Sequence, residues 1–450
     1  MAPGIPFAEA LWFWLRLGLI SFGGPAGQIA LMHRELVERK RWISDRRFLH
    51  ALNYCMLLPG PEAQQLATYI GWLLHRTWGG VAAGVLFVLP SLFILVALGW
   101  IYVVYGQVEW VAGLFYGIKP AVAAVVLHAV WRIGSRTLRH PAQAPLPWIV
   151  AVASFLAIAV AKLPFPWVVL GAALVGVAAG RWAPAQFAPV VASAQAEGTG
   201  APAHPRAVID DDTPTPPHAR FSTTGLARVA ATGALLWLLP MGVLVAAWGW
   251  QATLTQMGWF FSKAAMLTFG GAYAVLPYVY QGAVEQHGWV SAPQMMDALA
   301  LGEATPGPLI MVVAFVAFLG GWGHQVLGPD LLFLGGALAA TLVTWFTFLP
   351  SFLFILAGGP LVESTHGKLR FTAPLAAITA AVVGVIASLA LFFLLHIARD
   401  RPMPGWPVDL VALAIAAAAA FALFRTRLGV VPVIAACALL GMGLRLAGVA

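Results

Sequence analysis

Two Pro-Gly-Pro motifs interrupt apolar stretches of this chain, at residues 59–61 and 306–308. Two prolines one residue apart remove two backbone donors and clash with the preceding helical turn, so neither stretch is expected to continue as one helix. Within a membrane, such a break persists only where it is buried in protein or lines a cavity. The N–H groups that start the next half-helix carry partial positive charge and suit an anion. The alternative is a simple turn between two helices.

Polar side chains stand beside both breaks, where hydrocarbon alone would not tolerate them. A carboxylate inside a membrane segment is costly and usually functional. Glu62 and Glu303 therefore have two interpretations: a structural ion pair with Arg16 or Lys263, or a protonatable gate or acceptor that organises the donors around an anion. The candidate substrate-binding residues at the breaks are Asn53, Gly60, Glu62, Gln64, Gln65, Glu303, Thr305 and Gly307.

Three basic residues within apolar segments add full positive charge. Arg16 and Lys263 lie in mid-segment, and Lys119 precedes a proline. Arginine offers a planar fork to a dianion, and lysine offers a point charge. The alternative for all three is that the charged end reaches the membrane surface while only the stem is buried. All three are candidates for direct contact with the anion.

A second pair of glycine motifs follows Arg16 and Lys263. Small residues of this kind either let membrane helices pack closely or form a second helix break with N–H groups aimed at the same site. The candidate residues in these motifs are Ser21, Gly23 and Gly24 in the first and Thr268, Gly270 and Gly271 in the second.

These motifs need membrane helices to position them, and the composition supplies such helices. The chain has 450 residues, of which 61% are hydrophobic and 9% charged, and its mean hydropathy is +0.85. A soluble domain carries roughly 25% charged residues, so a soluble or disordered protein is excluded. Windows of about 20 residues predict about 10–13 membrane segments, some of them broken by Pro and Gly. We expect an all-α polytopic membrane protein.

The sequence repeats itself. The Ser-Phe-Gly-Gly motif at residue 21 matches Thr-Phe-Gly-Gly at residue 268, an offset of 247 (268 − 21), and the two Pro-Gly-Pro motifs have the same offset (306 − 59). Leu-Pro-Ser at 89–91 matches Leu-Pro-Ser at 349–351 at an offset of 260 (349 − 89). Trp42 and Trp289 also match, and each is interpreted as an anchor at the membrane surface.

A polar segment separates the two repeats. Residues 183–224 are rich in Pro, Ala, Ser and Thr, carry three consecutive aspartates and have no apolar period. We expect a flexible, solvated linker there. The chain is thus predicted to consist of an N-terminal membrane repeat, residues 1–182, and a C-terminal membrane repeat, residues 225–450.

Charge indicates that the repeats have opposite orientation. Residues 33–47 contain six Lys or Arg, whereas the matching stretch 280–297 contains none. Loops rich in Lys and Arg stay on the cytoplasmic side, so equivalent loops of the two repeats are predicted to lie on opposite sides of the membrane. This is the pattern of an inverted repeat.

The sequence lacks the motifs of several other classes of protein. There is no P-loop motif, no HExxH motif, and only two cysteines, far apart, so we expect no ATPase, no zinc enzyme, no metal site and no cofactor. No nucleophile and base form a convincing catalytic set, which leaves a membrane-embedded enzyme acting on an anionic lipid as a remote alternative. No basic stretch interleaved with aromatics favours nucleic acid. The expected partners are the lipid bilayer and a small oxyanion, and a homodimer is the default oligomer.

The motifs resemble those of the chromate ion transporter family in its long-chain, two-domain form. The resemblance rests on the Phe-Gly-Gly-Pro motif at 22–25, the Leu-Pro-Gly-Pro-Glu-Ala-Gln-Gln-Leu-Ala run at 58–67 and the Gly-Glu-Ala-Thr-Pro-Gly-Pro run at 302–308. It covers both halves and implies a bacterial inner-membrane protein that exports chromate and confers chromate resistance. Sulfate or molybdate transport, or anion exchange, is the alternative within transport.

Overall fold

The structure is a computed structural model, and its description covers residues 5–22, 24–187, 207–214, 216–269, 271–365, 372–400, 408–426 and 428–448. Most of these residues are helical, and the described chain has no strand beyond one isolated bridge, which confirms the all-α class. The first half contains α1 (Phe7–Ile20), α2 (Gly24–His33), η1 (Arg34–Arg39), α3 (Asp45–Cys55), α4 (Glu62–Tyr105), α5 (Glu109–Thr137), α6 (Pro145–Ala159), α7 (Phe165–Trp182) and η2 (Pro184–Phe187). The rest contains η4 (Pro217–Ala219), α8 (Thr223–Trp248), α9 (Thr253–Leu267), α10 (Ala272–Tyr280), η5 (Gln281–Gln286), α11 (Ala292–Ala304), η6 (Leu309–Met311), α12 (Val312–Gly323), η7 (Pro329–Leu331), α13 (Leu332–Thr365), α14 (Thr372–Asp400), α15 (Leu410–Arg425) and α16 (Val430–Leu446).

Many of these helices suit a bilayer. Six helices of the described chain are long and apolar enough to cross a membrane, namely α4, α5, α7, α8, α13 and α14, and four shorter apolar stretches correspond to α6, η6 with α12, α15 and α16. Large apolar side chains such as Leu174, Leu239 and Phe421 are exposed on the outer faces. An apolar surface of this extent is suited to lipid rather than to water. The chain is a multi-pass membrane protein.

The glycine motifs break helices. The apolar stretch 8–31 consists of α1 and α2, and the stretch 254–279 consists of α9 and α10, with a Phe-Gly-Gly motif between the two helices in each case. Of the two alternatives for these motifs, the structure forms the helix break. In addition, α4 bends at His75 and Arg76, whose backbone angles are non-helical, so it is two helices in succession.

The breaks of the two halves meet in one joint. The Gly60 N–H donates to the Thr268 carbonyl at 2.7 Å, and the Gly307 N–H donates to the Ser21 carbonyl at 2.9 Å. Gly307 is the repeat counterpart of Gly60, and Thr268 is that of Ser21, so the two hydrogen bonds are reciprocal. Reciprocal bonds are what a two-fold relation between the halves produces.

Glycine is required at both centres of this joint. The backbone angle φ is +128° at Gly60 and +105° at Gly307, values that residues with a side chain rarely adopt. A Cβ atom on Gly60 would lie 2.3 Å from Ser351 Oγ, and one on Gly307 would lie 2.7 Å from Ser91 Cβ. Since Ser91 and Ser351 are also repeat counterparts, each half packs a serine against the glycine of the other.

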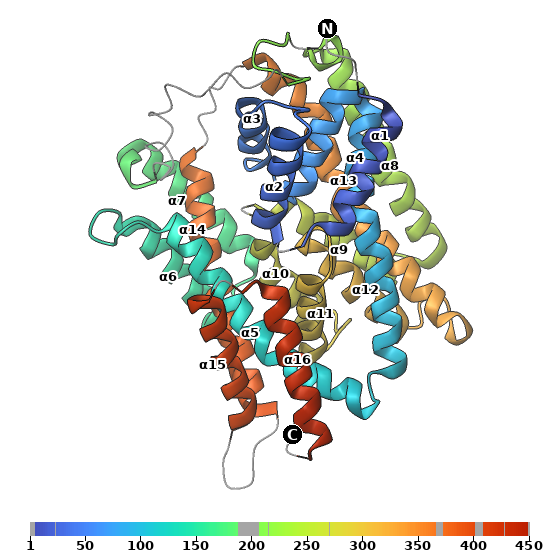
Figure 1. Cartoon of the computed structure of the whole chain (residues 1–450), viewed down its shortest axis with the longest axis vertical. Coiled ribbons are helices and arrows are strands. Elements are labelled where there is room, and N and C mark those ends of the chain that lie inside the picture. The colour runs from blue at the N-terminus through green and yellow to red at the C-terminus, as the bar shows by residue number, and fades with distance from the viewer. Residues whose placement is uncertain are drawn as a thin grey trace.

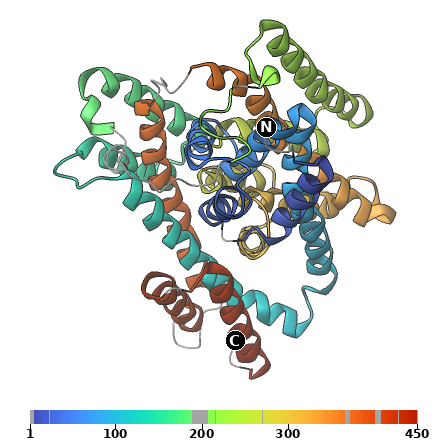
Figure 2. The same ribbon diagram turned by 45° about the horizontal axis from the view of Figure 1, so that its top comes forward.

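Matching helices of the two halves run in opposite directions. After its bend, α4 descends in Figure 1, whereas its counterpart α13 ascends, and Gly84 of α4 packs against Phe352 of α13. Figure 2 shows α5 and α14 side by side along one flank of the central helices, where they contact each other. Antiparallel counterparts are the arrangement of an inverted repeat, as the charge asymmetry predicts.

The two tryptophans interpreted as surface anchors are buried instead. Trp42 is 4% exposed and Trp289 is 5% exposed. Each follows a π-helical turn that directs the chain back into the protein, because the Trp42 N–H donates to the Leu36 carbonyl and the Trp289 N–H donates to the Ala283 carbonyl, both at 2.8 Å. The anchor interpretation is wrong because both rings lie among core residues, after equivalent turns in the two halves.

The C-terminal end of the predicted linker packs against the first half. Ile209 is 6% exposed and pairs with Ile43 in a parallel bridge, and Ser44 Oγ donates to Asp211 at 2.6 Å. The expectation of a solvated linker is wrong for Ile209, which is buried, whereas Asp211 and Asp212 beside it are exposed. Residues 188–206 of the linker lie outside the described residues.

A histidine extends the same contact. His218 Nε2 donates to the Trp72 carbonyl at 3.0 Å, beside the bend of α4. Burial lowers the pKa of His218, the hydrogen bond to Trp72 raises it, and the nearby Arg76 lowers it further. Because the pKa falls below its ordinary value, the ring is neutral at pH 7 and holds this segment by a hydrogen bond rather than by charge.

Candidate functional site

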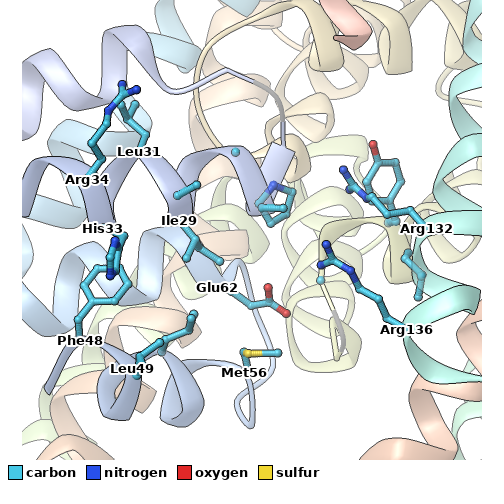
Figure 3. Close-up of a pocket in the computed structure, with 18 of the residues that line it drawn as sticks. Ile29, Leu31, His33, Arg34, Phe48, Leu49, Met56, Glu62, Arg132 and Arg136 are labelled. Carbon is cyan, nitrogen blue, oxygen red and sulfur yellow. The ribbon is translucent and has the colours of Figure 1, made fainter. Parts of the chain in front are cut away.

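A cavity of about 1090 Å³ lies between α2 and α3 on one side and α5 and α14 on the other. Glu62 and Gly271 line it at the joint between the halves, and His33 and Arg34 line it at the far end of α2. Figure 3 shows His33 and Arg34 on one wall and Arg132 and Arg136 on the facing wall, with Glu62 between them. We call this the Arg132 cavity, after a residue on its α5 wall.

The α5 wall carries two arginines. Arg132 and Arg136 both line the cavity, and because they are four residues apart they share one face of the helix. Both side chains extend from α5 into the space that Glu62 enters from the other side (Figure 3). Their place near the C-terminal end of α5 also favours positive charge. Arg132 is half-buried and Arg136 is exposed, so their guanidinium groups are accessible to an anion that enters the cavity.

Glu62 faces the helix break of the other half. It is the first residue of α4, next to the partial positive charge of that helix N-terminus. A Cβ atom on Gly271 would lie 3.8 Å from Glu62 Oε1, so the carboxylate lies close to that glycine. Gly271 precedes α10 with φ of +97°, and its counterpart Gly24 starts α2 with φ of +69°. Both glycines therefore serve the helix breaks that border the cavity.

The second carboxylate is connected to the cavity through a tyrosine. Tyr273 Oη donates to the Glu303 carboxylate, and the Arg132 guanidinium lies over the Tyr273 ring, 5.8 Å from its centroid. Tyr273 lines the cavity, whereas Glu303, 6% exposed, lies behind it. Arg132, Tyr273 and Glu303 thus form one chain of contacts from the α5 wall to the second Pro-Gly-Pro break.

Three of the sequence-predicted residues lie elsewhere. Arg16 on α1, Lys263 on α9 and Asn53 on α3 are all exposed, and none is among the described residues that line the Arg132 cavity. The Lys263 ammonium lies 5.5 Å from the ring centroid of Trp259. The exposure of Arg16 and Lys263 fits the alternative predicted from the sequence, in which the charged end of the side chain extends outward.

Several predicted residues form hydrogen bonds at or beside the breaks. Gln65 Nε2 donates to the Pro59 carbonyl at 2.8 Å, and Gln64 Nε2 donates to Thr68 Oγ1 at 2.9 Å, both fully buried. Thr305 bonds to the carbonyl of residue 302 within its own turn. A buried break needs such partners because every unpaired polar group in the membrane is costly.

The glycine N–H groups expected to face the anion have protein partners. Those of Gly60 and Gly307 donate to carbonyls of Thr268 and Ser21 in the other half. A residue that the sequence reasoning missed completes this arrangement: Gln28 Nε2 donates to the Gly307 carbonyl at 2.5 Å and to the Ser21 carbonyl at 3.2 Å. These groups join the halves, and the positive charge of the cavity comes from arginine.

Three predicted residues remain to be placed. Gly23 and Gly270 lie outside the described residues. Lys119 is on α5 but lines a different, smaller cavity nearer the other end of that helix.

The sequence contains a signal for the missed arginines. Arg132 and Arg136 have the spacing of one helix face and follow an apolar stretch long enough to span a membrane. Tyr273 has no such signal, because its role depends on how α10 packs against α5 and α11.

Fold and cavity together define a class: a multi-pass membrane protein of two interlocked halves, with a cationic cavity that leads to paired helix breaks, as in transporters of small anions. The chain belongs to the chromate transporter family, whose model matches residues 8–177 and 255–442. The two matched regions fall in the two halves.

Relatives cover most of the chain. It is 31% identical over 445 residues to the chromate transport protein of Pseudomonas aeruginosa, which covers 98% of this chain and 92% of the relative. It is 30% identical over 413 residues to the chromate transport protein of Cupriavidus metallidurans, covering 92% and 87%. The uncharacterized transporter YwrB of Bacillus subtilis matches only 34% of this chain but 74% of its own length, at 27% identity. No solved structure matches.

Proposed function

We propose that this protein exports chromate across the bacterial inner membrane. The observation that carries the proposal is the pair Arg132 and Arg136 in the membrane cavity of a chain from this family. Chromate is a tetrahedral dianion, and planar guanidinium groups bind oxyanions through two parallel hydrogen bonds each. Two arginines on one helix face can therefore neutralise both charges of one bound ion.

Glu62 sets how tightly the anion is held. Its carboxylate occupies the same cavity as the two arginines and lowers the net charge of the site. A site that binds too tightly would not release its ion, so one opposing carboxylate keeps exchange fast. When the cavity holds no anion, Glu62 supplies the negative charge that the arginines need.

The open end of the cavity faces the cytoplasm in this proposal. His33 and Arg34, which line that end, begin the stretch 33–47 with its six basic residues. Such stretches remain on the cytoplasmic side. Single cysteines at Val37 and Val284 provide a check, because an impermeant thiol reagent should label them from opposite sides of the membrane.

The membrane potential is a sufficient energy source for export. The bacterial interior is negative, and moving one charge across 100 mV is worth about 2.3 kcal/mol. A dianion leaving the cell gains about 4.6 kcal/mol per 100 mV, which corresponds to a concentration ratio on the order of a thousandfold. Neither ATP hydrolysis nor a bound cofactor is required.

Chromate uptake into inside-out membrane vesicles tests the proposal. Vesicles containing the protein should accumulate chromate when their lumen is made positive, and vesicles from cells without it should not. Sulfate has the same shape and charge, so it should compete. Uptake of sulfate with no uptake of chromate would replace chromate by sulfate as substrate, and uptake of neither ion would refute oxyanion transport.

A further inference from the structure

A second cavity, of about 370 Å³, lies nearer the other end of α5. We call it the Lys119 cavity. Its charged lining residues are Lys119 of α5, Asp297 of α11 and Arg445 of α16, and its neutral polar lining residues are Tyr102, Gln107, Tyr116 and Gln294. Most of its surface is polar, which is costly within a membrane protein unless the space holds water or a polar ligand.

The two cavities are built alike. In both cavities α5 forms one wall. The facing wall is α3 in the Arg132 cavity and α11 in the Lys119 cavity, and α11 is the repeat counterpart of α3. Lys119 and Arg132 are 13 positions apart on one helix, a separation of about 20 Å along its axis. Residues 121–126 of α5, between them, are all buried and apolar. The cavities thus lie toward opposite faces of the protein, with closed apolar packing between them.

The charges of the Lys119 cavity favour an anion. Among the described lining residues, two cations face one carboxylate. Tyr102 Oη donates to Asp297 Oδ2 at 2.9 Å, so one of the two oxygens of that carboxylate accepts from a neutral donor. By contrast, the Nε and Nη1 groups of Arg445 are buried and have no hydrogen-bond partner in the described chain. Buried guanidinium donors left without acceptors are destabilising, and an oxyanion supplies the acceptors they lack.

We propose that the Lys119 cavity is a second oxyanion site, which the exported ion occupies before its release on the far side of the membrane. This proposal rests on the proposed export function. In it, Arg132 and Lys119 of α5 lie toward opposite faces of the protein, along the route of the exported ion. Asp297 opposes the two cations here as Glu62 opposes the two arginines in the Arg132 cavity.

Binding of radiolabelled chromate to the purified full-length protein tests the number of sites. We expect two bound ions per chain in the wild type, and one in Lys119→Gln and in Arg445→Gln. Arg132→Gln should also bind one, and the double variant Arg132→Gln with Lys119→Gln should bind none. Lys263→Gln is the matched control, because it removes an exposed cation of α9 and should leave two.

A transport measurement separates this site from the export function itself. In inside-out vesicles, chromate loaded into the lumen should inhibit uptake, and Lys119→Gln and Arg445→Gln should raise the lumenal concentration for half-inhibition about tenfold while changing the external half-saturating concentration less than twofold. One bound ion in the wild type, or two in both variants, overturns the second site even if export is normal. Two bound ions with no transport overturn export and leave the second site standing.

Discussion

The two halves share the backbone of their joint but not the side chains around it. The hydrogen bond from Gly60 to Thr268 recurs from Gly307 to Ser21, and each glycine packs against a serine of the opposite half. The chemical groups do not recur: the repeat counterparts of Glu62, Glu303, Gln28 and Tyr273 are Leu309, Met56, Val275 and Ala26 respectively.

This difference separates two tasks. The repeated glycines and prolines create the breaks, and breaks related by a two-fold axis can be buried because each half supplies partners for the other. Charge is needed only where an ion binds, so the charged groups need not follow the repeat. Substitutions in the shared backbone should therefore affect folding, and substitutions of unshared side chains should affect transport.

The largest effect is expected for Gly60→Ala and Gly307→Ala. The positive φ costs about 1–2 kcal/mol for a residue with a side chain, and the new Cβ would overlap a buried serine. We expect both variants to lose most folded protein from the membrane, measured by the monodisperse fraction after detergent extraction. Gly242→Ala on α8 is the control, since its Cβ would meet open space. Normal yields for either variant would show that the joint tolerates strain and would refute its role.

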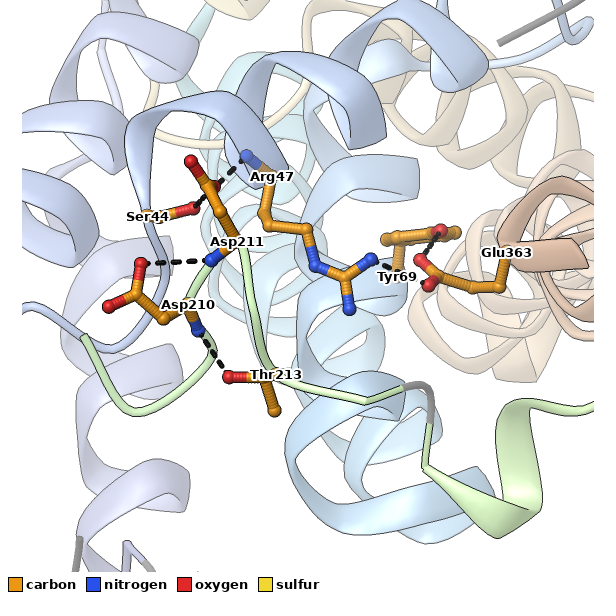
Figure 4. Close-up of polar contacts among 7 residues, drawn as sticks. All are labelled: Ser44, Arg47, Tyr69, Asp210, Asp211, Thr213 and Glu363. Carbon is orange, nitrogen blue, oxygen red and sulfur yellow. Dashed lines mark hydrogen bonds and ion pairs between the residues drawn. The ribbon is translucent and has the colours of Figure 1, made fainter. Parts of the chain in front are cut away.

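The next effect concerns polar links between the halves. Toward one face, Arg47 of α3 donates to Glu363 of α13 at 2.9 Å, and Tyr69 Oη donates to the same carboxylate at 2.5 Å (Figure 4). Nearer the other end of the molecule, Tyr102 of α4 donates to Asp297 of α11. The helices in the second link are the repeat counterparts of those in the first, but only the first link contains an ion pair.

Breaking the two links should have unequal effects on stability. Glu363→Gln leaves the Arg47 charge without its partner in a site where the carboxylate is 2% exposed, so we expect a loss approaching the roughly 3–5 kcal/mol of a broken buried pair. Tyr102→Phe removes one hydrogen bond, worth about 1 kcal/mol. Thermal unfolding of the two variants in detergent gives the comparison. An equal decrease in melting temperature would contradict the distinction between ion pair and hydrogen bond.

A smaller effect, on transport alone, is expected for Glu62→Gln. Removing this carboxylate strengthens the attraction between the cavity and a dianion by about 1 kcal/mol, a factor of about five in half-saturating concentration, and slows release. Chromate uptake into inside-out vesicles should then show a lower half-saturating concentration and a lower maximal rate. Glu38→Gln is the control, since Glu38 lines the exposed end of the same cavity and is screened by water. A weaker apparent affinity in Glu62→Gln would mean that Glu62 does not oppose the anion.

The smallest effect is expected in the linker. Deleting residues 192–205 should leave chromate resistance unchanged, because the segment is polar and has no apolar period. Extending the deletion to residue 215 removes Ile209, which pairs with Ile43, and Asp211, which accepts from Ser44 (Figure 4). The longer deletion should therefore lower the amount of protein in the membrane. Immunoblots of membrane fractions give the amount of protein for each of the two deletions. Loss of resistance with the shorter deletion at normal protein level would assign the linker a role in transport.

Sequence patterns predicted the breaks, whereas two of the predicted cations, Arg16 and Lys263, lie on exposed faces away from the Arg132 cavity, for a physical reason. Proline and glycine act on the local backbone, so their positions indicate where helices end whatever the tertiary packing. The direction of a cation depends on helix rotation, and an all-apolar helix has no polar face from which rotation can be deduced. The sequence therefore predicts Arg16 and Lys263 as anion contacts and does not single out Arg132, whose direction follows from the packing of α5.

The anion site itself is tested most directly by exchanging those cations in one assay. Chromate uptake into inside-out vesicles, measured against concentration and normalised to protein, should show half-saturating concentrations at least tenfold higher for Arg132→Gln and Arg136→Gln. Arg132→Lys should recover part of the loss, because it restores charge without the planar fork. Arg16→Gln and Lys263→Gln should stay within twofold of the wild type. The reverse pattern, with normal affinity in the α5 variants and weak affinity in the α1 and α9 variants, would contradict an anion site in the Arg132 cavity.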